Sequence, residues 1–390
     1  MNNILIYFDH PINPTQGGTE RTAFLLACLL KKQGFHVVFL SLLHTRKRND
    51  SLFPQYFLPD PLNLFSSSNS DFVEKICGNL NIGFILNEGA SSDSSFFFNH
   101  ACLKTNAQIV SILNFSIWEG LDHFHSLIPP MFGHGQTWPN MLKTAGRMLT
   151  APWKKYSSIR KKRNKLHHLL EYSDKVVVLS PSYASDCISF TAPRYSHKLH
   201  PIPNPLTFPV QEPFSLELKK NTLLYVGRLS YGDKRVDRLL NIWKKLHATH
   251  ADWCLKIVGD GEFREPLEKM AARDHLERVF FMGRQDPEPF YREAKILCMT
   301  STHEGMPMVI NEALAYGCLP IAFNSFHAAE EMIPNEETGR LVPAFDLEQY
   351  ARTLAELMKT PYQAPCRKVL ENYSEKTVTS KWLSCLKEQS

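Results

Sequence analysis

The sequence predicts an α/β protein of two domains, each built on a parallel sheet with helices on both faces. Its 390 residues are enough for two domains of roughly 100–200 residues. Short apolar segments alternate with amphipathic ones, which is typical of strands and helices in a parallel sheet. Five prolines between Pro201 and Pro213 interrupt this alternation, and it then starts again. The two halves are therefore expected to fold as separate Rossmann-like domains.

The first half opens with a strand, a glycine turn, a helix and a second strand. Asn3–Phe8 is a short apolar run, and Gly17 and Gly18 lie in the turn that follows. Residues 20–33 have apolar side chains at helical spacing, and residues 36–40 are again apolar, so the segment reads as a βαβ unit. Further buried strands are expected at residues 82–86, 108–113 and 175–179.

The proline-rich stretch is predicted to be the linker, because proline lacks an amide donor and biases the preceding residue toward extended geometry. We place an N-terminal domain at residues 1–203, a C-terminal domain at 204–373 and a last helix at 374–390. That helix is long enough to pack back on the N-terminal domain. In the second domain, strands are expected at 222–226, 253–258, 279–281, 296–299 and 319–322, and helices at 237–247, 265–273, 287–294 and 307–316.

Composition narrows the class of protein. With 43% hydrophobic and 21% charged residues the chain is typical of a globular protein, and we find no apolar run of the ~18 residues that a spanning helix needs. The N-terminus lacks the basic start of a signal peptide, so we expect a cytoplasmic location. Nine cysteines without a CxxC pair are expected to be free thiols.

Positive charge is concentrated in one segment. Residues 123–170 contain nine Lys and Arg and no acidic residue, within a chain of net charge +5. Apolar residues recur there at helical spacing, with Trp153 between two such runs. The segment either docks peripherally on an anionic membrane or covers the domain core with its charges simply solvated.

The densest polar pattern lies between a predicted strand and a predicted helix. After the strand at 296–299, Glu304 and Gly305 lie in a polar turn, Pro307 sits where a helix can begin, and Glu312 lies in the second turn of that helix. A helix N-terminus attracts phosphate through its amides and dipole, and a carboxylate beside it accepts hydrogen bonds from hydroxyls. Open α/β sheets bind ligands at the carboxyl ends of their strands, which is where this turn falls.

Two basic residues follow another strand of the same domain. Arg228 comes directly after residues 222–226, and Lys234 precedes the next helix. Both side chains are candidates to hold a diphosphate, Arg as a fork and Lys as a point charge. The turn Gly259-Asp260-Gly261 after the next strand lacks the third glycine of a dinucleotide fingerprint and is weak evidence alone.

In this order the motifs resemble the family 4 retaining glycosyltransferases. The resemblance is good over roughly residues 222–345 and thin before them. It implies the B-type (GT-B) fold, with two Rossmann-like domains facing each other across a cleft. It also implies that the N-terminal domain, residues 1–203, binds the acceptor and that the C-terminal domain, residues 204–373, binds the nucleotide sugar. The marks that carry it are Gly17-Gly18-Thr19-Glu20-Arg21, Val226-Gly227-Arg228-Leu229 with Lys234, Ile257-Val258-Gly259-Asp260-Gly261, Phe281-Met282-Gly283, and the Glu–seven residues–Glu motif from Glu304 to Glu312.

The resemblance implies catalytic roles for three residues. Arg228 and Lys234 would bind the donor diphosphate and stabilise charge on the leaving group. Glu304 would contact the donor sugar near its reacting carbon. Since the family retains anomeric configuration by front-face attack, we name no nucleophile.

Donor-binding roles follow from the same resemblance. Glu312 would bind the ribose hydroxyls, Gln285 would lie beside the nucleobase, and Gly17 and Gly18 would close over the diphosphate from the N-terminal domain. Gly305, Met306, Pro307 and Met308 would lie around the sugar and phosphates, and those of them that have a main-chain N–H would donate to these groups.

One position departs from the family pattern. Many relatives carry a histidine facing the acceptor after the strand that ends near Leu113, and here Asn114 follows that strand. Asparagine forms hydrogen bonds but does not act as a base at neutral pH. Asn114 is therefore a candidate acceptor-binding residue, and an acceptor-activating base is not identified.

No metal or other cofactor is expected. The sequence contains neither HExxH nor the DxD motif that bridges a divalent cation to a diphosphate, and basic side chains and amides can replace the metal.

The function predicted is transfer of a hexosyl or N-acetylhexosaminyl residue from a nucleotide sugar, expected to be a UDP-sugar, to a saccharide or lipid-linked saccharide acceptor. Surface-polysaccharide or lipopolysaccharide assembly is the expected setting. A nucleotide-sugar epimerase of the same fold and a non-catalytic glycan-binding subunit are the alternatives. Nucleic-acid binding is disfavoured by the mild net charge, and an NAD-dependent enzyme by the missing GxGxxG after the first strand.

Overall fold

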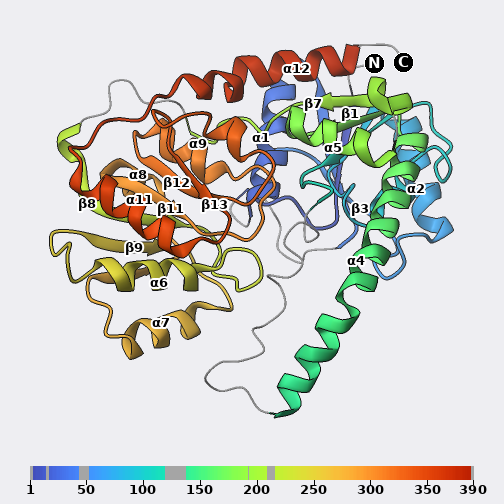
Figure 1. Cartoon of the computed structure of the whole chain (residues 1–390). Helices are drawn as coiled ribbons and strands as arrows, with labels where there is room; N and C mark the ends of the chain where they lie inside the picture. The colour runs from blue at the N-terminus through green and yellow to red at the C-terminus, as the bar shows by residue number, and fades with distance from the viewer. Residues whose placement is uncertain are drawn as a thin grey trace. The chain divides into compact units, whose positions relative to one another are not determined.

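The computed structural model describes residues 3–14, 17–43, 52–118, 138–191, 193–208 and 216–387, with the backbone alone at 138–152. It divides into two compact units (Figure 1). Unit 1 comprises Met1–Trp118, Lys155–Thr207 and Asn372–Ser390, and unit 2 comprises Glu119–Lys154 and Phe208–Glu371. Each unit is described by itself.

Unit 1 contains a parallel sheet whose strand order, within the described residues, is β3-β2-β1-β4-β5-β6-β7. Strand β1 pairs with β2 on one side, Ile4 opposite Val37, and with β4 on the other, Ile6 opposite Leu86. The order of the strands therefore reverses between β1 and β4. The strands are β1 Asn3–Phe8, β2 His36–Ser41, β3 Gln55–Phe57, β4 Ile82–Asn87, β5 Gln108–Leu113, β6 Lys175–Val178 and β7 Leu199–Pro201.

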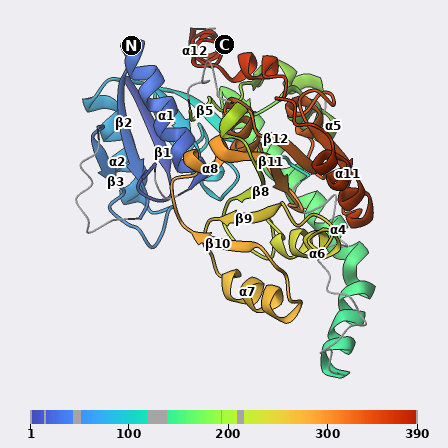
Figure 2. The same ribbon diagram turned by 90° about the vertical axis from the view of Figure 1, so that its left-hand side faces the viewer.

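Helices cover both faces of this sheet. The described helices of the unit are α1 Gly18–Lys32, α2 Ser67–Asn79, α3 Ser94–Phe97, α5 Pro181–Thr191 and α12 Glu375–Lys387, together with the part of α4, Trp138–Tyr172, that begins at Lys155. Figure 2 shows α1 lying along β1 and β2. The chain leaves α1 through Gly34, whose φ of +85° is a left-handed conformation that glycine adopts without strain.

The basic segment predicted at 123–170 lies largely on α4, a single long helix in Figure 1. Leu166, Leu169 and Leu170 near its C-terminal end are buried in unit 1, whereas the Trp153 side chain is 79% exposed. Residues 123–137 and the side chains of 138–152 lie outside the described part. Membrane docking therefore stays a prediction, and among the described helices none is long and apolar enough to cross a bilayer.

The last helix belongs to the core of unit 1. Val378 and Trp382 of α12 pack in one apolar cluster with Ile4 and Ile6 of β1. The Lys175 ammonium of β6 donates a hydrogen bond to the carbonyl of Cys385 on the same helix. Residues from the first strand and the last helix thus form one core.

Unit 2 is built on a second parallel sheet, with the strand order β10-β9-β8-β11-β12-β13 in the described residues. The strands are β8 Lys220–Val226, β9 Cys254–Val258, β10 Val279–Gly283, β11 Ala294–Met299, β12 Leu319–Asn324 and β13 Arg340–Pro343. The helices are α6 Val236–Leu246, α7 Arg264–Arg273, α8 Glu288–Glu293, α9 Met308–Ala315, α10 Ala329–Met332 and α11 Leu347–Lys359. Here the strand order reverses between β8 and β11, so the turns after these two strands meet at one edge.

Candidate active site

Two glycine turns are locked together at the carboxyl edge of the unit 2 sheet. The amide of Gly227, after β8, donates to the carbonyl of Val258 at 3.0 Å, and the amide of Leu229 donates to the carbonyl of Asp260 at 2.9 Å. At Gly259 a Cβ atom would lie 1.9 Å from the Gly227 carbonyl oxygen. The glycine that the sequence showed only as part of a GxG turn is thus required for close backbone approach, and the contact fixes the main chain at Arg228.

An ion pair joins the turns after β8 and β11. The Lys234 ammonium donates to both carboxylate oxygens of Glu304, at 2.7 and 2.8 Å, and the Ser301 hydroxyl donates to one of them at 2.7 Å. The Lys234 side chain is 25% exposed and that of Glu304 10%. The structure therefore brings together two predicted residues that are 70 positions apart in sequence. A partly desolvated pair of this kind is held in one geometry more firmly than an exposed one.

Arg228 extends from the same edge and contacts a carboxylate that sequence reasoning missed. Its guanidinium lies 3.3 Å from the Asp233 carboxylate, and its side chain is 66% exposed. His303 lies 3.4 Å from the other oxygen of Asp233. The hydrogen bond from His303 is the main influence that holds the pKa of Asp233 below its usual range, and the charges of His303, Arg228 and Lys234 add to it. The signal for Asp233 was its place directly before Lys234.

Glu312 is buried on α9, where its carboxylate accepts a hydrogen bond of 2.8 Å from the Tyr291 hydroxyl of α8. Glu312 is 4% exposed and Tyr291 is fully buried. The segment Gly305–Pro307 is buried as well and leads into α9, whose first residue is Met308. The second glutamate of the motif is therefore held by the fold, and Tyr291 is a partner that spacing alone did not reveal.

Gln285 lies apart from these residues in the sheet. It follows β10, the strand at the far side of β9, and its exposed amide donates to the Met282 carbonyl at 2.8 Å. This bond keeps the side chain against the turn after β10.

The remaining predicted residues belong to unit 1. Gly17 precedes α1 with the Glu20 carboxylate folded over it, so that a Cβ atom at Gly17 would lie 2.3 Å from that carboxylate. Gly18 is the first residue of α1. Asn114 follows β5 and donates a hydrogen bond of 2.9 Å to the carboxylate of Glu88, a residue that sequence reasoning did not single out. The signal for Glu88 was its position directly after β4.

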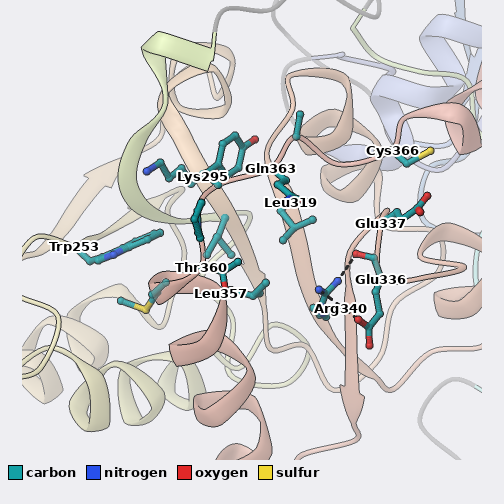
Figure 3. Close-up of a pocket in the computed structure, with 15 residues that line it drawn as sticks. Trp253, Lys295, Leu319, Glu336, Glu337, Arg340, Leu357, Thr360, Gln363 and Cys366 are labelled. Atoms are coloured by element: carbon teal, nitrogen blue, oxygen red, sulfur yellow. Dashed lines mark hydrogen bonds and ion pairs between the residues drawn. The ribbon is translucent and has the colours of Figure 1, made fainter.

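A pocket of about 350 Å³ lies elsewhere in unit 2. Figure 3 shows Trp253, Lys295 and Leu319 on its wall, with Arg340 paired to Glu336. Trp253 precedes β9, and Lys295, Leu319 and Arg340 stand at the starts of their strands. The pocket therefore lies at the amino ends of the strands, at the edge opposite Glu304, and is not part of the candidate active site.

Comparison with known proteins assigns the segment that carries these turns. Residues 210–377 match the family model "Glycosyl transferases group 1". This segment belongs to the glycosyl transferases group 1 family. The resemblance predicted from the Glu–seven residues–Glu motif is thereby confirmed.

Relatives extend the likeness from this segment to the whole chain. An uncharacterized glycosyltransferase of Haemophilus influenzae is 26% identical over 385 residues, which are 95% of this chain and 96% of that protein. A lipopolysaccharide 1,6-galactosyltransferase of Salmonella typhimurium is 34% identical over 130 residues, 32% of this chain and 35% of the relative. The solved structure of Anabaena HepE in complex with UDP-glucose matches with a TM-score of 0.71 at 15% identity, over 98% of this chain and 99% of that one. At that identity the structural likeness shows the fold, and the predicted GT-B fold is confirmed.

Proposed function

We propose that this glycosyl transferase moves a hexosyl or N-acetylhexosaminyl residue from a UDP-sugar to a saccharide or lipid-linked saccharide acceptor, with retention of configuration. The observation that carries the proposal is the Lys234–Glu304 ion pair beside Arg228, at the carboxyl edge where the strand order of unit 2 reverses. Open α/β sheets bind their ligands at this position. The likeness to the Salmonella lipopolysaccharide 1,6-galactosyltransferase supports lipopolysaccharide assembly as the setting, and the likeness to HepE in complex with UDP-glucose supports UDP as the nucleotide.

The basic side chains would act on the leaving group. As the bond between the anomeric carbon and the diphosphate oxygen breaks, negative charge grows on the diphosphate. The Arg228 side chain is two-thirds exposed and has room to turn toward a phosphate. Without a donor it forms the ion pair with Asp233. Lys234 would share its ammonium between Glu304 and the diphosphate. Charge stabilisation by preorganised groups of this kind is commonly the largest single contribution to catalysis.

The carboxylates would position the sugar and the nucleotide. Glu304, held by Lys234 and the Ser301 hydroxyl, would accept hydrogen bonds from donor-sugar hydroxyls near the reacting carbon. Glu312, held by Tyr291, would accept from the ribose hydroxyls. The segment from Gly305 to Met308 would lie around the sugar and phosphates, with the amides of Gly305, Met306 and Met308 as donors, and Gln285 would lie beside the base. Gly17 and Gly18 of unit 1 would contact the diphosphate.

We propose that the reaction needs no metal ion, since Arg228 and Lys234 supply the positive charge that a cation would bring. The setting we propose is cytoplasmic, with peripheral contact to an anionic membrane through the basic segment at 123–170.

The experiment that tests the proposal is a thermal-shift screen against UDP-, GDP-, ADP- and CDP-sugars, first without and then with Mg²⁺ or Mn²⁺. A ligand at 100 times its dissociation constant adds ~2.7 kcal/mol of stability, a shift of several degrees. We expect a UDP-sugar to stabilise the protein without metal, and the double substitution Arg228→Ala with Lys234→Ala to abolish the shift. Lys269→Ala is the matched control. Lys269 is exposed, and its ammonium forms an ion pair with Glu265 on the same helix, away from the candidate active site. Transfer of labelled sugar from the stabilising donor then identifies the acceptor.

The rival functions give different results. A nucleotide-sugar epimerase would convert the donor without any acceptor, whereas a glycan-binding subunit would show no shift with nucleotide sugars at millimolar concentration. Either result would contradict the transferase proposal.

A further inference from the structure

A buried carboxylate stands at the carboxyl edge of the unit 1 sheet. Glu88 directly follows β4 and is 5% exposed. Its main-chain amide donates to the Tyr7 carbonyl of β1 at 3.1 Å, which holds the residue beside the end of that strand. Because the strand order reverses between β1 and β4, Glu88 lies where an open α/β sheet binds ligands.

Asn114 approaches this carboxylate from the end of β5. Its side-chain amide donates to the Glu88 carboxylate at 2.9 Å and to the Glu88 main-chain carbonyl at 3.3 Å, and Asn114 is 7% exposed. Among the described residues, the Glu88 carboxylate accepts its side-chain hydrogen bond from the Asn114 amide. An ionised carboxylate offers about four lone-pair directions, so most of its capacity to accept hydrogen bonds remains for a ligand.

The surroundings of the Glu88 carboxyl place its pKa near neutral pH. Burial raises the pKa of Glu88 to about 7, and the bond from Asn114 opposes this rise. The other titratable groups at this edge interact among themselves: Tyr7 donates to Asp9, and the carboxylates of Asp93 and Asp9 attract the Lys165 ammonium. A general base is most effective when its pKa lies near the working pH.

The two units differ at the same topological position. At the reversal point of unit 2, Glu304 is neutralised by Lys234, next to Arg228, an arrangement suited to a diphosphate. At the reversal point of unit 1, Glu88 is bonded to a neutral amide. A carboxylate without a cation disfavours an anionic group and favours a neutral hydroxyl, which can donate to it.

We propose that Glu88 and Asn114 bind the attacking hydroxyl of a neutral saccharide acceptor, and that the Glu88 carboxylate accepts the proton of this hydroxyl during transfer. This inference rests on the proposed function. The hydroxyl oxygen bonds to the anomeric carbon, the bond from that carbon to the diphosphate breaks with its electron pair going to UDP, and the proton passes to Glu88. Water takes up this proton when the product leaves. Glu88 thus supplies the base that the asparagine at position 114 does not.

The test compares Glu88→Gln with the matched control Asp93→Asn. Gln at position 88 has the shape of Glu and still accepts from Asn114, and Asp93 is an exposed carboxylate on the same loop. Transfer from UDP-glucose, UDP-galactose and their N-acetyl forms to p-nitrophenyl glycosides is followed from pH 5.5 to 9, with hydrolysis of the same donors as the second readout. The thermal shift with UDP and the melting temperature at pH 8 are measured for each variant.

We expect the wild-type kcat to rise with pH through a limb near 7. Glu88→Gln should lower kcat at least about 100-fold at pH 8 and remove this limb, since a general base contributes ~10²–10⁴-fold. Its UDP shift should be unchanged and its melting temperature at pH 8 equal or higher. Asp93→Asn should stay within about twofold of wild type.

Glu88→Gln with wild-type kcat and pH profile would overturn the inference and leave the transferase proposal intact. So would a variant that melts lower and loses the UDP shift, because this would assign Glu88 a structural role. A wild-type protein that neither transfers nor hydrolyses any of these donors would contradict the proposed function itself.

Discussion

One added methyl group at Gly259 should disrupt the candidate active site through its backbone. The Cβ atom of an alanine there would lie 1.9 Å from the Gly227 carbonyl oxygen, so the two turns would have to separate by roughly 1.5 Å to reach ordinary contact. Gly259 also has a φ of +140°, a conformation that L side chains rarely adopt. Overpacking costs ~1–3 kcal/mol and an unfavourable backbone conformation ~1–3 kcal/mol. We therefore expect Gly259→Ala to destabilise unit 2 by about 3–5 kcal/mol.

The assay is calorimetry together with the UDP thermal shift. For a domain of this size 1 kcal/mol corresponds to ~2–4 °C, so the melting temperature of unit 2 should fall by about 10 °C. The UDP shift should weaken as well, because the displaced turn carries Arg228. Gly232→Ala is the matched control, since a Cβ atom there meets nothing within 4 Å, and it should melt within about 2 °C of wild type. If Gly259→Ala melts with the control and keeps its UDP shift, the steric reasoning is wrong.

Three further changes test the polar contacts. Lys234→Met should lower the ligand-free unfolding free energy by ~1–3 kcal/mol, because the largely buried Glu304 carboxylate loses its cation. The same change should abolish the UDP thermal shift. An unchanged midpoint of urea unfolding would contradict this reasoning. Tyr291→Phe removes the hydroxyl that donates to Glu312 and should lower the unfolding free energy by ~1–3 kcal/mol. It should also weaken UDP binding measured by titration calorimetry. An equal affinity would mean that Glu312 needs no such partner. Since the pKa of Glu88 rises from 4.5 to about 7 on folding, the folded state binds more protons in this window and stability falls as pH rises through it. Glu88→Gln should therefore be more stable than wild type above pH 7, by up to ~3 kcal/mol in urea unfolding, and equal stability at pH 8 would show that Glu88 is not so buried.

The sequence predicted the fold wherever a strand was a continuous apolar run. Residues 108–113 were placed as β5, and residues 222–226 form most of β8. By contrast β3, Gln55–Phe57, has three half-buried residues and no periodicity, so no local signal distinguished it from a loop. The edge strands β7 and β13 were not predicted either. β7 has three residues and ends in a proline, and β13 has four and ends in a proline, so both were too short to show a pattern.

The candidate site was predicted residue by residue, but its pairings were not. Spacing indicated that Lys234 and Glu304 follow strands, yet their contact depends on which strands are neighbours in the sheet, and β8 and β11 are adjacent only after folding. Glu88 was missed for a related reason. In sequence it is one acidic residue after a strand, and its chemical character comes from burial and from Asn114, which lies 26 positions later.

The position of α12 has a consequence for synthesis of the chain on the ribosome. The apolar cluster that contains Ile4 and Ile6 also contains Val378 and Trp382. The first strand therefore cannot bury this part of its apolar surface until the last helix has been synthesised. At ~5–20 residues per second, the ribosome makes the intervening stretch in roughly 20–75 s. During that time the surface that α12 covers is exposed on the nascent chain, while residues 216–371 of unit 2 emerge as one continuous segment with a core of their own. We therefore expect nascent chains arrested before residue 374 to bind hydrophobic chaperones through unit 1, and full-length chains to release them.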